Sequence, residues 1–212
     1  MSKTDLDLAR MCKEAYQVGH EDVYSIRDIE ALVQEHNDCI TIAFRGTEVS
    51  PFSEVTNLFD TLRNFRFWKY RTVTGADAHK GFARAAEHWA FAFYTNLRQI
   101  GKPLVITGHS QGAAVAVQSV PVFISKGFDV LRCAVFAEPA SWRSGDEEMY
   151  QEYEVPSVSY LNENDWIRFA PPWGSTGVPR TYLNKKKGIS KKAHSMDNYV
   201  KAMEDYAVKS EE

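Results

Sequence analysis

Apolar residues recur at two different spacings along this chain, and the two spacings alternate. In residues 81–99 apolar side chains return every third or fourth position, and residues 6–16 carry a shorter stripe of the same kind. This is the period of a helix with one buried face. Residues 104–108 (LVITG) are instead mostly apolar with no alternation, as expected for a strand that is covered on both faces of a parallel sheet.

The same reasoning predicts further elements on both sides of that strand. Residues 29–46 indicate two strands joined at Asn37 and Asp38, residue types that tolerate tight turns. Two additional strands and a closing helix are expected further along the chain, in residues 131–139, 155–165 and 193–209. Strands that alternate with helices indicate an α/β fold with a mostly parallel central sheet flanked by helices.

Composition and charge are those of an ordinary globular chain. Its 212 residues fit one domain, residues 1–212, without a repeat or a linker, and 44% of them are hydrophobic. A net charge of -3 gives no electrostatic reason to expect nucleic acid as a partner. The three cysteines are scattered and the histidines show no ligand spacing, so we expect no metal and no cofactor. With neither a signal segment nor a membrane-spanning stretch in view, the sequence predicts a cytoplasmic protein.

A candidate nucleophile, Ser110, lies where the strand of residues 104–108 meets the small residues that follow it. Residues 108–112 read Gly-His-Ser-Gln-Gly, and a G-x-S-x-G pattern between a strand and a helix is typical of a nucleophile elbow. Its glycines let the strand and the helix approach each other. The first turn of the helix brings N–H groups and a positive dipole end towards developing negative charge. The alternative is a chance match on an ordinary turn, which the small residues after Ser110 disfavour.

A serine hydroxyl needs a base to take its proton, and the base needs an acid to orient it. In hydrolases with such an elbow the order along the chain is serine, acid, histidine, and only His194 follows Ser110 among the histidines. Asp165 comes after an apolar, strand-like run, so the end of a strand would bring its carboxylate to the site. Glu163 is the nearest competitor, and spacing alone does not separate the two acids.

Five segments along the chain carry a further pattern: AFRGTE, HKGFARAAEHW, VITGHSQG, LNENDWIRFAPP and HSMDNY. In this order they resemble the fungal-type class 3 lipase family, over about residues 5–199. The resemblance implies an α/β-hydrolase fold and a serine hydrolase that cleaves carboxylic esters of lipids. It also favours Asp165 over Glu163 as the acid.

The resemblance further implies a role for each residue of the site. Ser110, Asp165 and His194 would form the catalytic triad. Thr47 and Gln111 would form the oxyanion hole, Gln111 through its backbone N–H directly after the nucleophile. No cofactor and no metal are implied.

Three stretches leave the natural substrate open. Residues 48–70 stand where that family keeps its lid, and they fit either a mobile amphipathic flap or an ordinary helix packed on the core. The five lysines in residues 184–194 are interpreted as a solvated loop, the alternative being attraction to an anionic lipid surface. Residues 136–142 (FAEPASW) depart from the family's Pro-Arg-Val-Gly stretch.

The expected partner is therefore a lipid or small ester substrate, with transient contact to a membrane or lipid interface. Three alternative functions stay open from the sequence: a soluble short-chain carboxylesterase, a phospholipase, and a catalytically inactive lipid-binding module. An inactive module has no use for a serine, an acid and a histidine in this order, which argues against the last of them.

Overall fold

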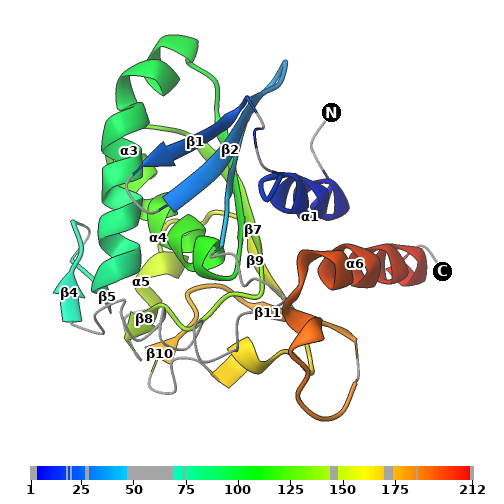
Figure 1. Ribbon diagram of the computed structural model, residues 1–212. Helices are drawn as coiled ribbons and strands as arrows, with labels where there is room; N and C mark the ends of the chain where they lie inside the picture. The colour runs from blue at the N-terminus through cyan, green and yellow to red at the C-terminus, as the bar shows by residue number, and fades with distance from the viewer. Residues whose placement is uncertain are drawn as a thin grey trace.

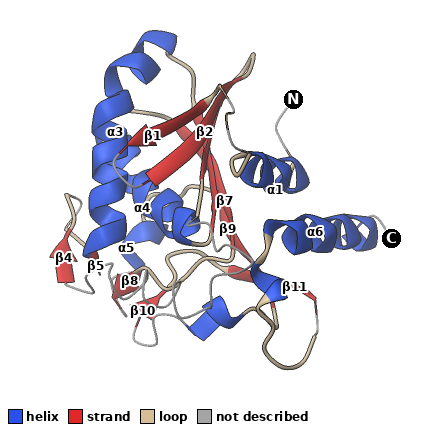
Figure 2. Ribbon diagram, viewed as in Figure 1, coloured by secondary structure: helices blue, strands red, loops and turns tan. Residues whose placement is uncertain are grey.

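A seven-stranded sheet forms the middle of the protein, and helices cover both of its faces (Figures 1 and 2). The strands lie in the order β1-β2-β3-β6-β7-β9-β11. The first two pairs are antiparallel and the other four are parallel, so the sheet is mostly parallel, as the sequence predicts. The computed structural model describes residues 4–17, 19, 21–26, 29–46, 69–73, 75–143, 148–169, 174–184 and 186–210.

The central strands of this sheet are buried from end to end. Every residue of β3 (Ile40–Phe44) and β6 (Leu104–His109) is buried, because helices pack on both faces of the sheet at this point. The first and last strands are more exposed, as is usual for sheet edges. The other members are β1 (Val23–Ile26), β2 (Ile29–Glu35), β7 (Val130–Phe136), β9 (Ser157–Asn162) and β11 (Arg180–Asn184).

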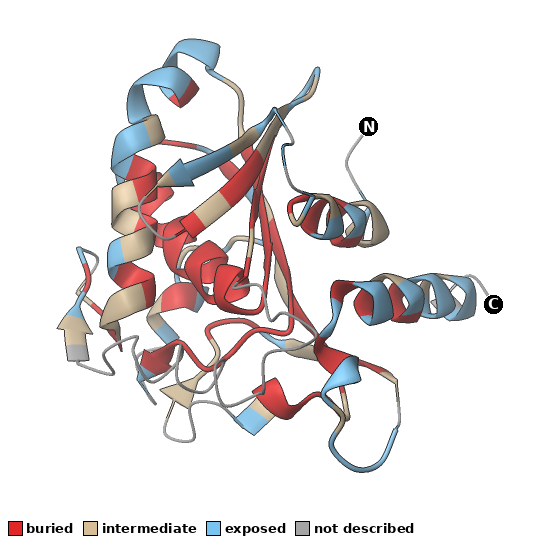
Figure 3. Cartoon of the chain, viewed as in Figure 1, coloured by how far each residue is buried: buried red, intermediate tan, exposed pale blue. Residues whose placement is uncertain are grey.

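Two helix pairs form the outer layers. On one face α3 (Lys80–Ile100) packs against α4 (Gln111–Ser125), and on the other α1 (Asp5–Glu14) packs against α6 (Met196–Ser210) (Figure 1). Helix α4 lies between the sheet and α3, so its residues 111–123 are all buried (Figure 3). Its Gly-Ala-Ala-Val-Ala-Val sequence allows this close approach on every side.

A second sheet has four very short strands in the order β10-β8-β5-β4. The sequence does not predict it, because strands of two or three residues are too short to show a period. The strands are β4 (Lys69–Arg71), β5 (Asp77–His79), β8 (Trp142–Arg143) and β10 (Gly174–Ser175). Three one-turn helices complete the described elements: α5 (Glu148–Gln151), η1 (Trp166–Phe169) and η2 (Lys192–His194).

Most of the predicted elements are confirmed. In the hairpin of β2 and β3, the N–H of His36 donates to the carbonyl of Cys39 over 2.8 Å and closes the turn. The start of the final helix was predicted wrongly. It begins at Met196 instead of residue 193, because Ser195 is extended with a ψ of 145°, and His194 belongs to the separate turn η2. Strands β1 and β11 are also absent from the prediction.

The lid interpretation falls almost wholly outside the described residues. Residues 48–68 lie outside them, and Lys69 and Tyr70 begin strand β4. Within the described part of the chain, no helix is both long and apolar enough to span a bilayer. The three cysteines are buried free thiols.

Candidate active site

Ser110 occupies a sharp turn between β6 and α4. Its φ of 56° and ψ of -124° place it in a backbone region that residues with side chains rarely adopt. The flanking glycines explain how the chain accommodates this turn. A Cβ at Gly108 would overlap the carbonyl group of Gly112, and a Cβ at Gly112 would overlap the carbonyl group of Phe44 in β3. The close packing that holds Ser110 in place therefore depends on both glycines.

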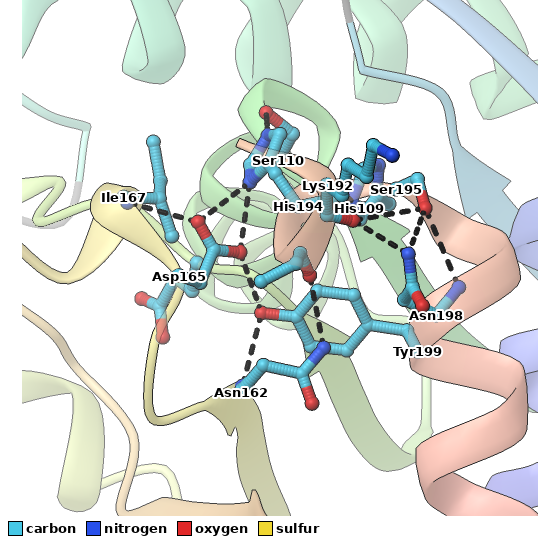
Figure 4. A network of polar contacts seen from close by, with 12 residues as sticks. His109, Ser110, Asn162, Asp165, Ile167, Lys192, His194, Ser195, Asn198 and Tyr199 are labelled. Atoms are coloured by element: carbon cyan, nitrogen blue, oxygen red, sulfur yellow. Dashed lines mark hydrogen bonds and ion pairs between the residues drawn. The ribbon is translucent and has the colours of Figure 1, made fainter. Parts of the chain in front are cut away.

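The structure brings Ser110, His194 and Asp165 into one hydrogen-bonded line (Figure 4). Oγ of Ser110 lies 2.8 Å from Nε2 of His194. Nδ1 of the same ring lies 2.9 Å from Oδ2 and 3.1 Å from Oδ1 of Asp165. All three side chains are buried, and they come from three loops that follow β6, β9 and β11 at the carboxyl edge of the parallel sheet.

The surroundings of Asp165 keep its carboxylate ionised. Its oxygens accept the N–H of Ile167 over 3.0 Å and the hydroxyl of Tyr199 over 2.8 Å. Burial by itself raises the pKa of this carboxyl. The charge of His194 and the hydrogen bonds to the carboxylate outweigh burial, so the pKa of Asp165 lies below its ordinary value. A carboxylate can only accept, so Nδ1 of His194 carries its proton and Nε2 is left to accept from Ser110.

Glu163, the competing acid, does not take this place. Its described contact is made by its main-chain carbonyl, which accepts from the guanidinium of Arg168 over 2.5 Å. The carboxylate that meets the imidazole belongs to Asp165. Both acids lie in the turn after β9, in which the N–H of Asp165 donates to the carbonyl of Asn162.

Of the two residues expected in the oxyanion hole, the structure describes Gln111. Gln111 is the first residue of α4 and directly follows Ser110, so its N–H belongs to the positive end of a buried helix. Thr47 lies outside the described residues. The chain reaches it from Gly46, which lies against the elbow: a Cβ there would stand 2.9 Å from Cβ of Ser110.

A hydrogen-bonded chain that the sequence did not reveal connects Gly46 to the base. The N–H of Gly46 lies 3.0 Å from the hydroxyl of Tyr16, this hydroxyl lies 2.7 Å from Nδ1 of His109, and Nε2 of His109 lies 2.8 Å from the main-chain carbonyl of His194. A carbonyl only accepts, so Nε2 of His109 is the donor and its Nδ1 accepts from Tyr16. Burial, with the charge of His194 adding to it, lowers the pKa of His109 to about 3, which agrees with a neutral ring.

The turn that carries His194 is held by side chains that the sequence analysis did not single out. Nδ2 of Asn162 donates to the carbonyl of Ala193 over 2.9 Å, and Nδ2 of Asn198 donates to the carbonyl of Lys192 over 2.6 Å (Figure 4). Tyr199 accepts the N–H of Asn162 while it donates to the acid. Their proximity to the predicted acid and base was the only sequence signal for these residues, because Asn162 and Tyr199 act through contacts that are distant in sequence.

Comparison with known sequences identifies one family. The sequence profile of the lipase (class 3) family matches residues 41–175. No curated protein sequence matches the chain significantly.

Comparison with solved structures gives the same fold. The triacylglyceride lipase of Rhizomucor miehei superimposes with a TM-score of 0.66 at 16% identity, over 85% of this chain and 80% of that one. A mono- and diacylglycerol lipase from Aspergillus oryzae gives 0.65 at 16% identity, over 92% and 86%. A triacylglycerol lipase whose catalytic centre is formed by a serine protease triad gives 0.63 at 17% identity, over 85% and 77%. The fold shared with these lipases is the α/β-hydrolase fold.

Proposed function

Because this chain belongs to the class 3 lipase family, it is a carboxylic ester hydrolase, and we propose that its reaction runs through Ser110, His194 and Asp165. One observation carries the proposal. The serine of a strained strand–helix turn is within hydrogen-bonding distance of an imidazole, and the other nitrogen of that imidazole faces a buried carboxylate. This is the geometry that turns a hydroxyl into a nucleophile at neutral pH.

The first half of the reaction forms an acyl-enzyme. Oγ of Ser110 attacks the ester carbonyl carbon while Nε2 of His194 takes the hydroxyl proton. The carbonyl oxygen becomes an oxyanion, and the proposed donors that stabilise it are the N–H of Gln111, at the start of α4, and Thr47. The tetrahedral intermediate then collapses. The carbon–oxygen bond to the alcohol breaks, and His194 returns its proton to the departing alcohol oxygen.

The second half releases the acid. His194 takes a proton from a water molecule, whose oxygen attacks the acyl carbon on Ser110. The second tetrahedral intermediate breaks its bond to Oγ, the proton returns to the serine, and a carboxylic acid leaves. Asp165 stays ionised throughout and stabilises the positive imidazole in both halves, while Tyr199 and the N–H of Ile167 hold the carboxylate in place.

The substrate is a lipid or small ester, and we propose that it is a lipid presented at an interface. The match to the lipase family supports a lipid, and burial of the triad means that any reacting carbonyl has to leave water to reach Ser110. A soluble short-chain ester could react at the same triad. The length of the preferred acyl chain therefore distinguishes an interfacial lipid from a short-chain ester as the substrate.

The test is hydrolysis of p-nitrophenyl esters of increasing chain length, with and without detergent micelles. We expect the hydrolysis rate to be highest for long acyl chains and to rise above the critical micelle concentration. Ser110→Ala and His194→Ala should be slower by about four orders of magnitude or more. Ser125→Ala is the matched control, because its described hydrogen bond is to the carbonyl of Val122 within α4. Equal rates in wild type and Ser110→Ala would overturn the proposal.

A further inference from the structure

A strongly basic stretch leads directly into the residue proposed as the base. Residues 180–194 contain six basic residues and no acidic one, in a chain whose net charge is -3. The structure describes four of its lysines, Lys186, Lys187, Lys191 and Lys192, and all four are exposed. We call residues 186–192 the basic loop; it is the orange segment between β11 and η2 in Figure 1 and is mostly pale blue in Figure 3.

The basic loop is fixed to the active site by its main chain. The N–H of Ser190 donates to the carbonyl of Asn164 over 2.8 Å, beside Asp165, and the two segments form a parallel bridge at Asp165. At the other end, the N–H of His194 donates to the carbonyl of Lys191 over 3.2 Å. A surface that touches the basic loop is therefore within a few residues of the acid and the base.

Within the part of the chain that the structure describes, the lysines of the basic loop have no acidic partner. Among the described residues, no carboxylate lies within ion-pair distance of any of the four side chains. The nearest acids in sequence are Asp165, which faces His194, and Asp197, which pairs with Lys13 over 2.7 Å. Four positive charges on one short loop give a local field whose sign is opposite to that of the whole chain.

Exposed apolar side chains accompany these charges. Ile189, near the middle of the basic loop, is 69% exposed, and Phe169 in η1 and Tyr182 in β11 are 54% and 49% exposed. The guanidinium of Arg168 lies over both rings, 4.9 Å from the centre of Phe169 and 5.9 Å from that of Tyr182. Ile189 stands between Lys187 and Lys191, so an apolar side chain is exposed among the charges of the loop. Mixed basic and apolar side chains are instead typical of a surface that binds anionic lipid headgroups and enters the acyl boundary.

We propose that the basic loop, with Phe169 and Tyr182 beside it, is a docking surface for anionic phospholipid, so that the active site is brought against negatively charged lipid surfaces in preference to neutral ones. The inference rests on the proposed function, because docking would bring the hydrolase to its lipid substrate. Binding to the lipid surface does not itself require catalysis. Lysines would meet the headgroup phosphates, and Ile189 would enter the layer below them. A nucleic acid offers phosphates without an apolar layer and leaves Ile189 without a role.

Binding is tested with the intact chain carrying Ser110→Ala, so that lipid is not consumed. The probes are vesicles of phosphatidylcholine alone and vesicles that also contain phosphatidylglycerol, each sedimented at low and high salt. We expect binding only to the anionic vesicles, weakening with salt. Lys186→Gln with Lys187→Gln should lower this binding about 25-fold, or about five-fold per lysine.

Two control pairs separate charge from folding. Lys186→Arg with Lys187→Arg keeps the charge and should keep the binding. Lys201→Gln with Lys209→Gln removes the same charge from exposed positions on α6 and should bind like the parent. Ile189→Ser should weaken vesicle binding about ten-fold.

Equal binding to both vesicle types, or no difference between the two lysine-to-glutamine pairs, would overturn the proposal. Competition by double-stranded DNA together with an unchanged Ile189→Ser variant would indicate a general polyanion site and would overturn it as well. Hydrolysis of a soluble p-nitrophenyl ester by the chain with Ser110 intact reports the proposed function separately. If the chain binds vesicles but does not hydrolyse the soluble ester, the proposed function is wrong and the docking surface still stands.

Discussion

Nε2 of His109 lies 2.8 Å from the main-chain carbonyl oxygen of His194, so the residue before the nucleophile holds the backbone of the residue that activates it. The opposite nitrogen of His109 accepts from Tyr16, which also receives the N–H of Gly46. The end of β3, the elbow and the base are thereby joined through one tyrosine hydroxyl. Helix α1, which ends just before Tyr16, contributes to the site although it supplies no triad member.

Tyr16→Phe tests this connection. The change leaves Nδ1 of His109 without its donor and the N–H of Gly46 without its acceptor, and each unpaired group costs about 1–3 kcal/mol when buried. We expect kcat for a soluble ester to fall about 10- to 100-fold through misplacement of the elbow and the base, with a smaller change in KM. Steady-state kinetics on the folded variant provide the measurement.

Tyr206→Phe serves as the control for Tyr16→Phe, because Tyr206 lies on α6 in edge contact with Tyr160, away from the triad. An unchanged kcat in Tyr16→Phe would show that the connection has no influence on the reaction. A parallel loss in both variants would point to a general loss of structure.

Asp165→Asn tests which ring nitrogen of His194 carries the proton. An amide at this position can donate to Nδ1 of His194 and so favours the tautomer with its proton on Nε2, which cannot accept from Ser110. We expect kcat to fall about 10⁴-fold with the fold intact. Glu163→Gln is the matched control and should retain activity, because the carboxylate that meets the imidazole is that of Asp165. Equal losses in the two variants would contradict the assignment of the acid.

Gly112→Ala tests the packing of the elbow. The added Cβ would overlap the carbonyl group of Phe44, which belongs to a buried strand and cannot move without disturbing the sheet. We expect a loss of about 3 kcal/mol in the free energy of unfolding, measured by denaturant titration. Gly19→Ala has a positive φ of 80° but meets no atom within 4 Å, so it should lose only about 1 kcal/mol. Similar losses in both variants would contradict the role of close approach.

Glu138→Gln tests a buried acid at the end of β7, in the stretch where the sequence departs from the lipase pattern. Glu138 is fully buried, and among the described residues neither carboxyl oxygen has a hydrogen-bonding partner. Burial raises the pKa of Glu138 from 4.5 to about 8, although the Ser159 hydroxyl and Arg180 oppose the rise. The folded state therefore keeps a proton that the unfolded chain releases, and stability falls as the pH rises from 4.5 towards 8.

The measurement is Tm as a function of pH for wild type, Glu138→Gln and the exposed control Glu152→Gln. We expect wild type to lose roughly 3–6 °C per pH unit through this window relative to Glu138→Gln, while Glu152→Gln follows wild type. Parallel curves for wild type and Glu138→Gln would contradict the raised pKa.

The sequence predicted the parts of this protein that depend on local pattern. The helix of residues 81–99 follows from its period, because it buries one face. The buried strand before Ser110 and the helix after it follow from composition, because their residues are mostly apolar or small. The nucleophile elbow could be predicted because contacts within and next to the G-x-S-x-G motif require its glycines. The choice of Asp165 over Glu163 needed the family resemblance, since both acids stand in the same loop.

The contacts that hold the site could not be predicted, because they join residues that are far apart in the chain. Tyr16 and His109 are 93 positions apart, and Asp165 and Tyr199 are 34 apart. Tyr16, His109 and Tyr199 each have an ordinary explanation in their own segment, as a core aromatic or a packed histidine. The short strands of the second sheet were missed for a different reason, since two or three residues cannot display a period.

Treating the purified protein with a fluorophosphonate and mapping the modified peptide by mass spectrometry tests directly whether Ser110 is the nucleophile. We expect one adduct, on Ser110, that forms quickly in wild type, very slowly in His194→Ala and never in Ser110→Ala. An adduct on any other serine of the folded protein, or labelling of Ser110→Ala at the wild-type rate, would contradict this assignment.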